Sequence, residues 1–364
     1  MGSPLFLVYY DLGLGGVQRK IVDLVNFLST VRPNLDIHIL LRRKSSFSLA
    51  RQIINKKVSL YYYCDWYKVR IPVFFPVFVF YKTWKMNPRA ILAFSDSSAL
   101  SAIWATHLLP WRSIRVVVGE DRYVPAEVAT YRFAQLRQFL IRRFYPFADA
   151  IFSPSPEMAQ DLVHSCKLPK DKVKIIENWV TPGQKKLADT TKVYDLIYVG
   201  RLTSVKNLTF LLEGIKKLRE NKESIRLCLV GEGDRMNYLQ SWVYSHGIRS
   251  NVLFAGATQN VEKYLAKSKI FVISSKAEGL PMSMLEAMVH GIPVLASDYP
   301  GILGIIKNGK AGYVYSNLGD FVKKATRLLD DATLRTEKGK AARAYVMKYH
   351  SSQNINLYLE ALQI

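Results

Sequence analysis

Short apolar runs alternate with longer segments of helical periodicity along the whole chain, and this alternation is the feature that most constrains the fold. Six strand-like runs come first: 5–10, 36–41, 90–94, 114–119, 150–155 and 173–178. Six more follow: 195–200, 226–231, 252–256, 270–275, 293–298 and 312–315. Amphipathic segments such as 207–220 lie between them. Strands that alternate with helices favour parallel sheets covered on both faces, so we predict an α/β fold.

Twelve strands are too many for one small doubly wound domain, and 364 residues suffice for two domains of ordinary size. The polar stretch 181–192 separates the two series of strands and is typical of a linker. We therefore predict an N-terminal Rossmann-like domain over 1–180 and a C-terminal one over 193–345. The tail, 346–364, has a helical pattern and could cross back to the N-terminal domain.

The chain is strongly basic, with 51 Lys and Arg against 29 Asp and Glu and a formal net charge of +22. Such a charge indicates an anionic partner: nucleic acid, a phosphorylated substrate or an acidic membrane. Residues 1–143 hold 21 of the basic residues and 8 acidic ones, and 11 of the 24 residues in 61–84 are aromatic. Basic and aromatic side chains together suit a membrane interface, although the same run could be domain core. No DNA- or RNA-binding motif is visible, so a nucleic-acid partner is not expected.

Targeting and redox features are few. No run of 18 or more apolar residues exists, and no basic region precedes the first strand, so we expect neither a membrane span nor a signal peptide. Cys64, Cys166 and Cys228 are odd in number and widely spaced, which favours a reduced cytoplasmic environment over a disulfide or metal framework.

Three segments could carry chemistry, and each follows a predicted strand. In 11–20, the turn with Gly15 and Gly16 would let backbone amides approach an anion, although a simple tight turn remains open. In 199–207, Gly200 ends a strand, and Arg201 and Lys206 could clamp a diphosphate, or be ordinary surface cations.

The third segment, 274–297, contains Glu278 and Glu286 eight positions apart. Gly279 permits a turn, and Pro281 suits the first turn of a helix that begins near Met282. Because this places Glu278 before the helix and Glu286 on it, two separate hydroxyl-binding roles are favoured over a shared-proton pair. A solvated turn is the alternative.

Taken together, these segments resemble the retaining glycosyltransferases of family 4. The resemblance rests on Gly-Arg-Leu-x4-Asn with Lys206, Leu-Val-Gly-Glu-Gly at 229–233, Glu-x7-Glu at 278–286 and the run 291–301. It implies the GT-B fold, two Rossmann-like domains facing across a cleft. Arg201 and Lys206 would bind the diphosphate of a nucleotide sugar, Glu286 the ribose and Glu278 the donor sugar. The full donor-binding set that it implies is Gly15, Gly16, Gly200, Arg201, Lys206, Gly231, Glu278, Gly279, Leu280, Pro281 and Glu286.

The resemblance also implies a mechanism. The chain has no Asp-x-Asp, so we expect a metal-independent enzyme without a cofactor, in which fixed cations stabilise the leaving diphosphate. Members of the family favour a front-face reaction, so Glu278 is expected to position the sugar rather than attack it. Where many relatives place a histidine, this chain has Glu120 and Asp121, and Asp121 joins Glu278, Arg201 and Lys206 as a catalytic candidate.

The resemblance therefore implies transfer of a hexosyl or N-acetylhexosaminyl group from a nucleotide-diphosphate donor. The sequence does not decide between UDP and GDP, and UDP is favoured only as a prior. The expected acceptor is a glycan, either a lipid-linked oligosaccharide or one of the lipopolysaccharide or capsule type. The protein would lie on the inner face of the cytoplasmic membrane and bind its anionic surface. Two alternatives remain: a soluble sugar synthase acting on a free acceptor, and a catalytically idle subunit that binds a partner.

Overall fold

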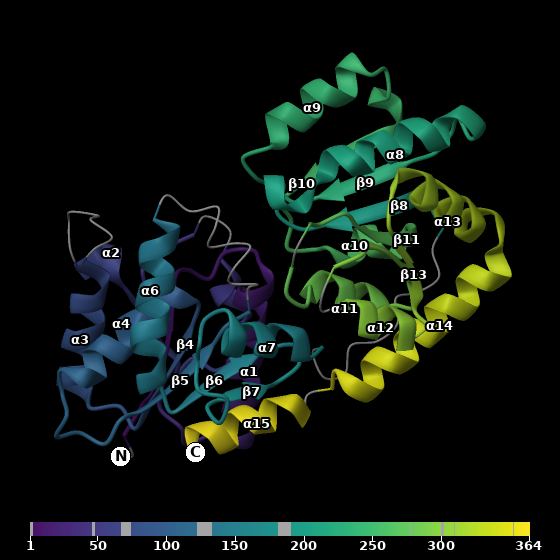
Figure 1. The fold of residues 1–364 in the computed structure, drawn as a ribbon. Coiled ribbons are helices and arrows are strands. Elements are labelled where there is room, and N and C mark those ends of the chain that lie inside the picture. The colour runs from purple at the N-terminus through teal and green to yellow at the C-terminus, as the bar shows by residue number, and fades with distance from the viewer. Residues whose placement is uncertain are drawn as a thin grey trace. The chain divides into compact units, whose positions relative to one another are not determined.

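The computed structural model describes residues 3–45, 48–66, 74–121, 133–180, 191–276, 278–299, 302–308, 310–351 and 353–364. The chain forms two compact units (Figure 1). Unit 1 comprises Met1–Asn178 together with Gln353–Ile364, and unit 2 comprises Trp179–Ser352. The C-terminal segment therefore belongs with the N-terminal part of the chain. Most of the predicted linker, 181–190, lies outside the described residues.

Unit 1 is built on a parallel seven-stranded sheet with the order β3-β2-β1-β4-β5-β6-β7. Its strands are β1 (Leu5–Tyr9), β2 (Ile37–Leu41), β3 (Ser59–Tyr62), β4 (Ala90–Phe94), β5 (Arg115–Gly119), β6 (Ala150–Ser153) and β7 (Val173–Ile175). All residues of β2 and β4 are buried, as expected for parallel strands covered on both faces. The sequence analysis missed β3. This edge strand has only half-buried residues and merges into the aromatic run, so neither alternation nor a continuous apolar run marks it.

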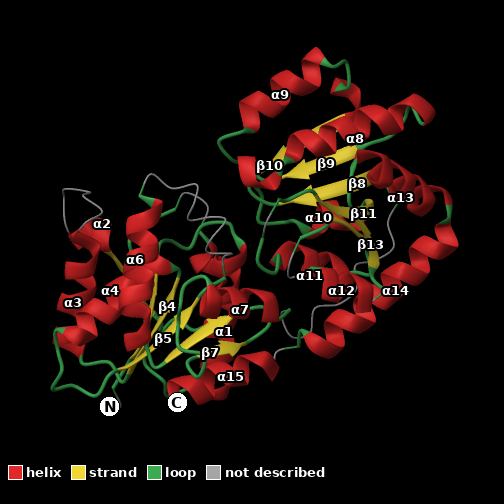
Figure 2. Cartoon of the chain, viewed as in Figure 1, coloured by secondary structure: helices red, strands yellow, loops and turns green. Residues whose placement is uncertain are grey.

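Helices cover both faces of this sheet (Figure 2). They are α1 (Gly16–Val31), α2 (Tyr63–Trp66), α3 (Phe75–Met86), α4 (Asp96–His107), α6 (Ala134–Phe144), α7 (Pro156–His164) and α15 (Gln353–Leu362), with 3-10 turns η1 (Leu49–Gln52) and η3 (Tyr145–Phe147). One core joins Phe6, Ile91 and Val118 of the strands to α3, α4 and α6. The tail helix α15 contacts β4 and β5, and the ring of its Tyr358 lies 4.8 Å from that of Phe152.

The aromatic run 61–84 is divided between core and surface. Tyr63, Phe75 and Phe78 are buried in the unit 1 core. Phe74 and Trp84, in contrast, are 42% and 52% exposed. Residues 67–73 lie outside the described residues. The core interpretation is therefore confirmed for part of the run, and the membrane interpretation stays a prediction for the exposed residues.

Unit 2 has a parallel six-stranded sheet with the order β10-β9-β8-β11-β12-β13. Its strands are β8 (Tyr194–Val199), β9 (Leu227–Val230), β10 (Val252–Gly256), β11 (Ser268–Ile273), β12 (Val294–Ser297) and β13 (Gly312–Tyr315). These are the six strands that the sequence predicts for the second half of the chain, within two residues at each end. Long apolar runs bounded by glycine and polar residues made them recognisable.

Helices also cover both faces of the unit 2 sheet. They are α8 (Leu208–Asn221), α9 (Met236–Ser245), α10 (Glu262–Ala266), α11 (Met282–Val289), α12 (Leu303–Asn308), α13 (Leu318–Asp330) and α14 (Ala332–Tyr349), with 3-10 turns η4 (Ser204–Lys206) and η5 (Arg249–Asn251). Neighbouring strand residues belong to two separate cores: Ile197, Cys228 and Phe271 pack on one face, against α11 and α14, whereas Leu196 and Leu227 pack on the other, against α8 and α13. Each unit is thus a three-layer α/β sandwich of the Rossmann type.

Candidate active site

The strand order of unit 2 places its candidate site at a switch point of the sheet. From β8, the chain continues outward through β9 and β10 on one side and through β11, β12 and β13 on the other. At such a point, the loops after the two central strands diverge and leave room for a ligand at the carboxyl ends of the strands. Arg201 and Lys206 follow β8, and Glu278 follows β11. These three predicted residues therefore belong to the two loops that meet there.

Glycines allow the loops after β8 and β9 to approach each other closely. Gly231 has φ +136°, a conformation that side chains disfavour, and a Cβ at this position would lie 2.0 Å from the carbonyl oxygen of Gly200. The amide of Leu202 also donates to the carbonyl of Glu232 at 2.9 Å. The motif glycines Gly200 and Gly231 are thus required for the backbone packing of these loops.

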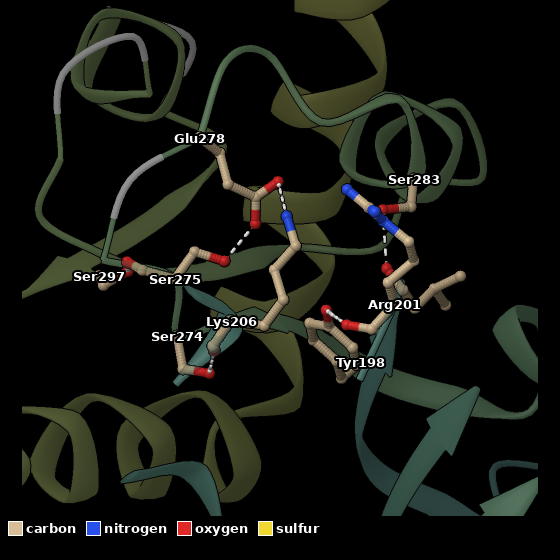
Figure 3. A network of polar contacts seen from close by, with 9 residues as sticks. Tyr198, Arg201, Lys206, Ser274, Ser275, Glu278, Ser283 and Ser297 are labelled. Carbon is tan, nitrogen blue, oxygen red and sulfur yellow. Dashed lines mark hydrogen bonds and ion pairs between the residues drawn. The ribbon is translucent and has the colours of Figure 1, made fainter. Parts of the chain in front are cut away.

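Lys206 and Glu278 form an ion pair in the site (Figure 3). The Nζ of Lys206 lies 2.7 Å from Oε2 of Glu278, and the two side chains are 15% and 13% exposed. The Ser275 hydroxyl donates to the other carboxylate oxygen of Glu278. Both carboxylate oxygens therefore have partners that fix the orientation of the group.

Three further hydroxyls hold the surrounding loops in place. Ser274 donates to the carbonyl of Lys206 at 2.8 Å, and Ser297 donates to that of Ser275 at 2.7 Å. Ser283, on α11, donates to the carbonyl of Val199 at 2.9 Å. These serines join the carboxyl ends of β8, β11 and β12 (Figure 3). The sequence analysis did not identify them, although Ser274, Ser275 and Ser297 each stand at the end of a predicted strand, which is a usable signal.

Arg201 differs from Lys206 in its surroundings. Its backbone carbonyl accepts a hydrogen bond from the buried hydroxyl of Tyr198 at 3.0 Å. Its guanidinium is exposed and forms no ion pair with any residue that the structure describes. An uncompensated cation beside a paired one makes this loop attractive to an anion, because a guanidinium matches phosphate oxygens in charge and geometry.

The Glu-Gly-Leu-Pro turn leads into α11 as the sequence predicts. Leu280 is buried, Pro281 immediately precedes the first helical residue, and Glu286 lies in the second turn, half-buried. One local feature has no signal in the sequence. Asn207 precedes α8, but its backbone is left-handed (φ 49°) and its side chain makes no capping hydrogen bond. Asn207 also directly follows the 3-10 turn η4, so it lies between two helical segments.

In unit 1, the glycine-containing turn is organised by a buried carboxylate. Asp11 accepts hydrogen bonds from the amide of Gly13 at 3.0 Å and from Nε2 of Gln18 at 3.1 Å. Nε of Arg43 lies 2.9 Å from its other oxygen. Gly15 then stands at the N-cap of α1, and Gly16 is the first helical residue. Both glycines thus lie at the carboxyl end of β1, next to β4, at the switch point of this sheet.

Asp121 lies in unit 1, after β5, and is already engaged. Its Oδ1 lies 2.7 Å from Nζ of Lys20, a lysine that is only 2% exposed and also donates to Oδ1 of Asn178 at 3.0 Å. The Lys20 ammonium also lies 5.5 Å from the ring centre of Tyr358. Burial alone would lower the pKa of Lys20, but the charges of Asp121 and Tyr358 outweigh it and raise the pKa. Sequence reasoning missed Lys20, because it lies on the buried face of α1.

The titratable groups around Glu278 include a set of buried tyrosines. Burial, followed by the negative charge of Glu278, raises the pKa values of Tyr198 and Tyr299 well above the ordinary value. Both phenols therefore stay protonated at neutral pH and can act only through their hydroxyl groups. Within the described ranges, no group of three or more His, Cys, Asp and Glu residues has an arrangement that could hold a metal ion.

Two family models match the chain, one over each half. The model described as glycosyl transferases group 1 matches residues 183–345, and the one described as glycosyltransferase family 4 matches residues 14–184. Together they match residues 14–345, which include all of the predicted donor-binding and catalytic residues.

Curated relatives are similar over part of their length. An uncharacterised glycosyltransferase of Methanocaldococcus jannaschii is 31% identical over 166 residues, which are 43% of this chain and 41% of that protein. The N-acetylgalactosamine-N,N'-diacetylbacillosaminyl-diphospho-undecaprenol 4-alpha-N-acetylgalactosaminyltransferase of Campylobacter jejuni is 28% identical over 214 residues, 57% of this chain and 58% of that protein. The chain thus spans about half the length of these two relatives.

A solved structure has a similar fold over nearly the whole length of this chain. The Anabaena protein HepE, crystallised with UDP and glucose, has a TM-score of 0.81 at 15% sequence identity and covers 99% of this chain and 98% of its own. This likeness shows the fold, which is the predicted GT-B fold with two Rossmann-like domains.

Proposed function

Because the chain belongs to the group 1 and family 4 glycosyltransferases, we propose that it transfers a sugar from a nucleotide-diphosphate donor to a glycan or lipid-linked acceptor. Unit 2 binds the donor in this proposal. The transfer proceeds with retention of the anomeric configuration and needs neither a metal nor a cofactor, as the sequence predicts. The transferred group is a hexosyl or N-acetylhexosaminyl residue.

The observation that carries this proposal is the arrangement of three charges at the switch point of unit 2. Arg201 has an exposed, unpaired guanidinium within the described chain, and Lys206 is held by Glu278 at 2.7 Å. A diphosphate entering at the carboxyl ends of β8 and β11 would meet both cations. A phosphate competes well for Lys206, because it offers several charged acceptor oxygens.

The charged side chains of Arg201 and Lys206 also assist the transfer step in this proposal. Breaking the bond between sugar and phosphate places a developing negative charge on the leaving diphosphate, and Arg201 and Lys206 stabilise it from fixed positions. The Glu278 carboxylate is held by Ser275 and Lys206, and this restraint suits a group that orients sugar hydroxyls. Glu278 therefore positions the sugar rather than attacking it.

UDP is the favoured nucleotide. The structurally similar HepE was crystallised with UDP and glucose, which supports this choice. The Campylobacter relative is named for transfer to a diphospho-undecaprenol glycan, which supports a lipid-linked acceptor. An acceptor of this kind would be presented at a membrane surface.

A basic and apolar surface of unit 1 supports binding to such a membrane. Figure 1 shows α3, α4 and α6 side by side, and α4 contacts both of its neighbours. The exposed apolar residues of these helices and of the segments next to their ends, here termed the aromatic patch, are Phe74, Val77, Trp84, Trp104, Leu108, Trp111, Phe133, Leu136, Phe139 and Phe147. Lys85, Arg142 and Arg143 are exposed on the same elements. Aromatic side chains beside cations suit the headgroup region of an anionic bilayer. None of the described helices is long and apolar enough to cross a bilayer.

A nucleotide-sugar panel tests the donor proposal. We expect one or more UDP-sugars to raise the melting temperature of the protein, because a ligand that binds only the folded state stabilises it. Lys206→Met should lose most of this shift. Transfer followed by NMR should give a product with the anomeric configuration of the donor. If no nucleotide or nucleotide sugar raises the melting temperature, the donor-site assignment is wrong.

Co-sedimentation with vesicles tests the membrane proposal. Binding to vesicles containing phosphatidylglycerol should exceed binding to purely zwitterionic vesicles and should weaken at high salt. Phe139→Glu, within the aromatic patch, should reduce binding about tenfold, since it places a carboxylate against anionic lipid. Tyr244→Glu is the control, because Tyr244 is 79% exposed but lies in unit 2. Equal binding to both vesicle types would contradict the proposal and favour a soluble sugar synthase acting on a free acceptor.

A catalytically idle partner subunit is the other alternative. It predicts that the protein neither transfers nor hydrolyses any donor, and that Glu278→Ala leaves the cellular glycan unchanged. The presence of Arg201, Lys206, Glu278 and Glu286 together favours the enzyme.

A further inference from the structure

Three buried tyrosines surround the carboxyl ends of the central strands in unit 2. Tyr198 is 3% exposed, Tyr299 2% and Tyr315 4%. The hydroxyl of Tyr198 donates to the carbonyl of Arg201 at 3.0 Å, and that of Tyr315 donates to the carbonyl of Ile273 at 2.9 Å. Two of the three phenols therefore stabilise the loops that carry the site.

Tyr299 is different. Its hydroxyl is buried and has no hydrogen-bond partner among the residues that the structure describes. A buried hydroxyl without a partner is unfavourable, so such groups are rare and call for a physical explanation. The ring itself is well packed in the same core as Leu280 and Met282. Phenylalanine would thus serve the packing equally well, and the hydroxyl needs another reason.

The position of Tyr299 suggests that reason. It lies two residues after β12, beyond Ser297, whose hydroxyl binds the carbonyl of Ser275. The amide of Asp298 is fixed at 3.2 Å from the carbonyl of Tyr315. Ser275, which Ser297 holds, is also the residue that donates to Glu278, so the segment that leads to Tyr299 is tied to the loop that carries this carboxylate. Burial, and after it the negative charge of Glu278, raises the pKa of the Tyr299 phenol.

Donor binding would change the surroundings of Glu278. One carboxylate oxygen accepts from Ser275, and the other is neutralised by Lys206 at 2.7 Å. If a diphosphate draws the Lys206 ammonium toward itself, that second oxygen is left largely buried, since Glu278 is 13% exposed. A carboxylate in this situation needs a new donor, because an unpaired buried charge is strongly unfavourable.

We propose that Tyr299 is a positioning residue that donates its hydroxyl to the Glu278 carboxylate once a nucleotide sugar has drawn Lys206 away. This proposal rests on the proposed function of unit 2. The unpaired hydroxyl is then a group held ready for the ligand-bound state. It keeps the Glu278 carboxylate oriented toward the donor sugar while Lys206 neutralises phosphate.

Tyr299→Phe tests this role against a purely structural one. Without ligand, the variant should melt at the wild-type temperature or above it, because the lost hydroxyl had no partner. Its affinity for the UDP-sugar that stabilises the wild type should fall about tenfold, the effect of losing one charge-assisted hydrogen bond.

Tyr315→Phe is the matched control. It removes an equally buried phenol whose hydroxyl binds a backbone carbonyl, so it should lower the melting temperature while donor affinity stays within about twofold. A Tyr299→Phe protein that melts well below the wild type would overturn the proposal, because its hydroxyl would then have a structural role. Wild-type donor affinity in Tyr299→Phe would overturn it as well.

A double-mutant cycle shows whether Tyr299 acts through Glu278. In a Glu278→Gln background, Tyr299→Phe should change donor affinity by less than about twofold, because the charged acceptor is absent. An undiminished tenfold effect would contradict the proposal. Failure of the proposed function is distinguishable, since in that case the wild-type protein itself binds no nucleotide sugar.

Discussion

Nζ of Lys206 and Oε2 of Glu278 lie 2.7 Å apart at the carboxyl ends of β8 and β11. A second ion pair, Lys269 with Asp195, spans the amino ends of the same two strands, also at 2.7 Å. The two pairs are alike in chemistry and distance but lie at opposite edges of the sheet. Only the pair at the carboxyl edge is at the switch point, so comparing the two pairs tests the proposed donor-binding role of Lys206 and Glu278 against a purely structural one.

Lys206→Met should weaken nucleotide-sugar binding about 10- to 100-fold, because it removes a charge-assisted contact to the diphosphate and leaves Glu278 without its cation. Isothermal titration with the donor found in the thermal-shift panel measures this loss. Lys269→Met is the matched control and should cost stability without changing donor affinity. Equal losses in both variants would mean that Lys206 acts only through the folding of unit 2.

The buried pair of Lys20 and Asp121 should be important for the stability of unit 1. Lys20→Met leaves the Asp121 carboxylate, which is 8% exposed, without its cation, and we expect a loss of about 3–5 kcal/mol. Hydrogen exchange of the β1 and α1 amides reports the local loss. Lys217→Met is the control: it breaks an exposed pair with Glu220 and should cost less than about 0.5 kcal/mol. Unchanged exchange in the Lys20 variant would contradict the expectation.

The same pair should persist at high pH. The pKa of Lys20 is raised above its ordinary value of 10.5 in the folded protein, so its contribution is fully present below that value. It is lost only as the pH rises through the higher folded pKa. Below about pH 10.5 the pair should therefore stay intact, and its loss should not reduce the exchange protection of the α1 amides. A loss that begins near pH 9 and is absent in Lys20→Met would contradict this prediction.

The two buried cysteines should resist thiol reagents. Burial raises the pKa of Cys166 and of Cys228 to about 12, so both thiols remain protonated in the folded protein at pH 8. Cys64 is only half-buried and should react first. Mass spectrometry after timed labelling should show one modified thiol before the other two. Simultaneous labelling of all three would contradict the described packing.

These thiols also predict an alkaline loss of stability. Between about pH 9 and pH 12 the unfolded chain releases thiol protons that the folded chain retains, so stability falls as the pH rises. The expected slope is about 1.4 kcal/mol per pH unit for each thiol. Urea unfolding of Cys228→Ser, compared with the wild type across this range, measures the contribution of Cys228. The same slope of stability against pH in Cys228→Ser and in the wild type would contradict this prediction.

Gly231→Ala should disrupt the packing of the loops after β8 and β9. The added Cβ would lie 2.0 Å from the carbonyl oxygen of Gly200, and the backbone has φ +136°. We expect a lower melting temperature and loss of the nucleotide-sugar shift. Gly256→Ala is the comparison, since its φ of +70° is also unfavourable but no atom lies within 4 Å of the added Cβ. A milder loss, of about 1 kcal/mol, is expected there.

Much of the fold could be predicted from local patterns. All twelve expected strands are present, because strands of a covered parallel sheet are continuous apolar runs that end at glycine and polar residues. The helix that carries Glu286 begins at Met282 as predicted. The edge strand β3 and the η4 turn before Asn207 could not be predicted, since partial burial and a left-handed backbone leave no periodic signal.

The sequence alone determined the α/β class, the division into two series of strands and the motif loops at their ends, because apolar periodicity and glycine positions are local properties. Only the tertiary structure decided which polar groups meet, such as Lys206 with Glu278 and Lys20 with Asp121. These contacts depend on strand order, which places the loops after β8 and β11 side by side. Strand order results from the packing of whole helices and sheets, and no local pattern encodes it.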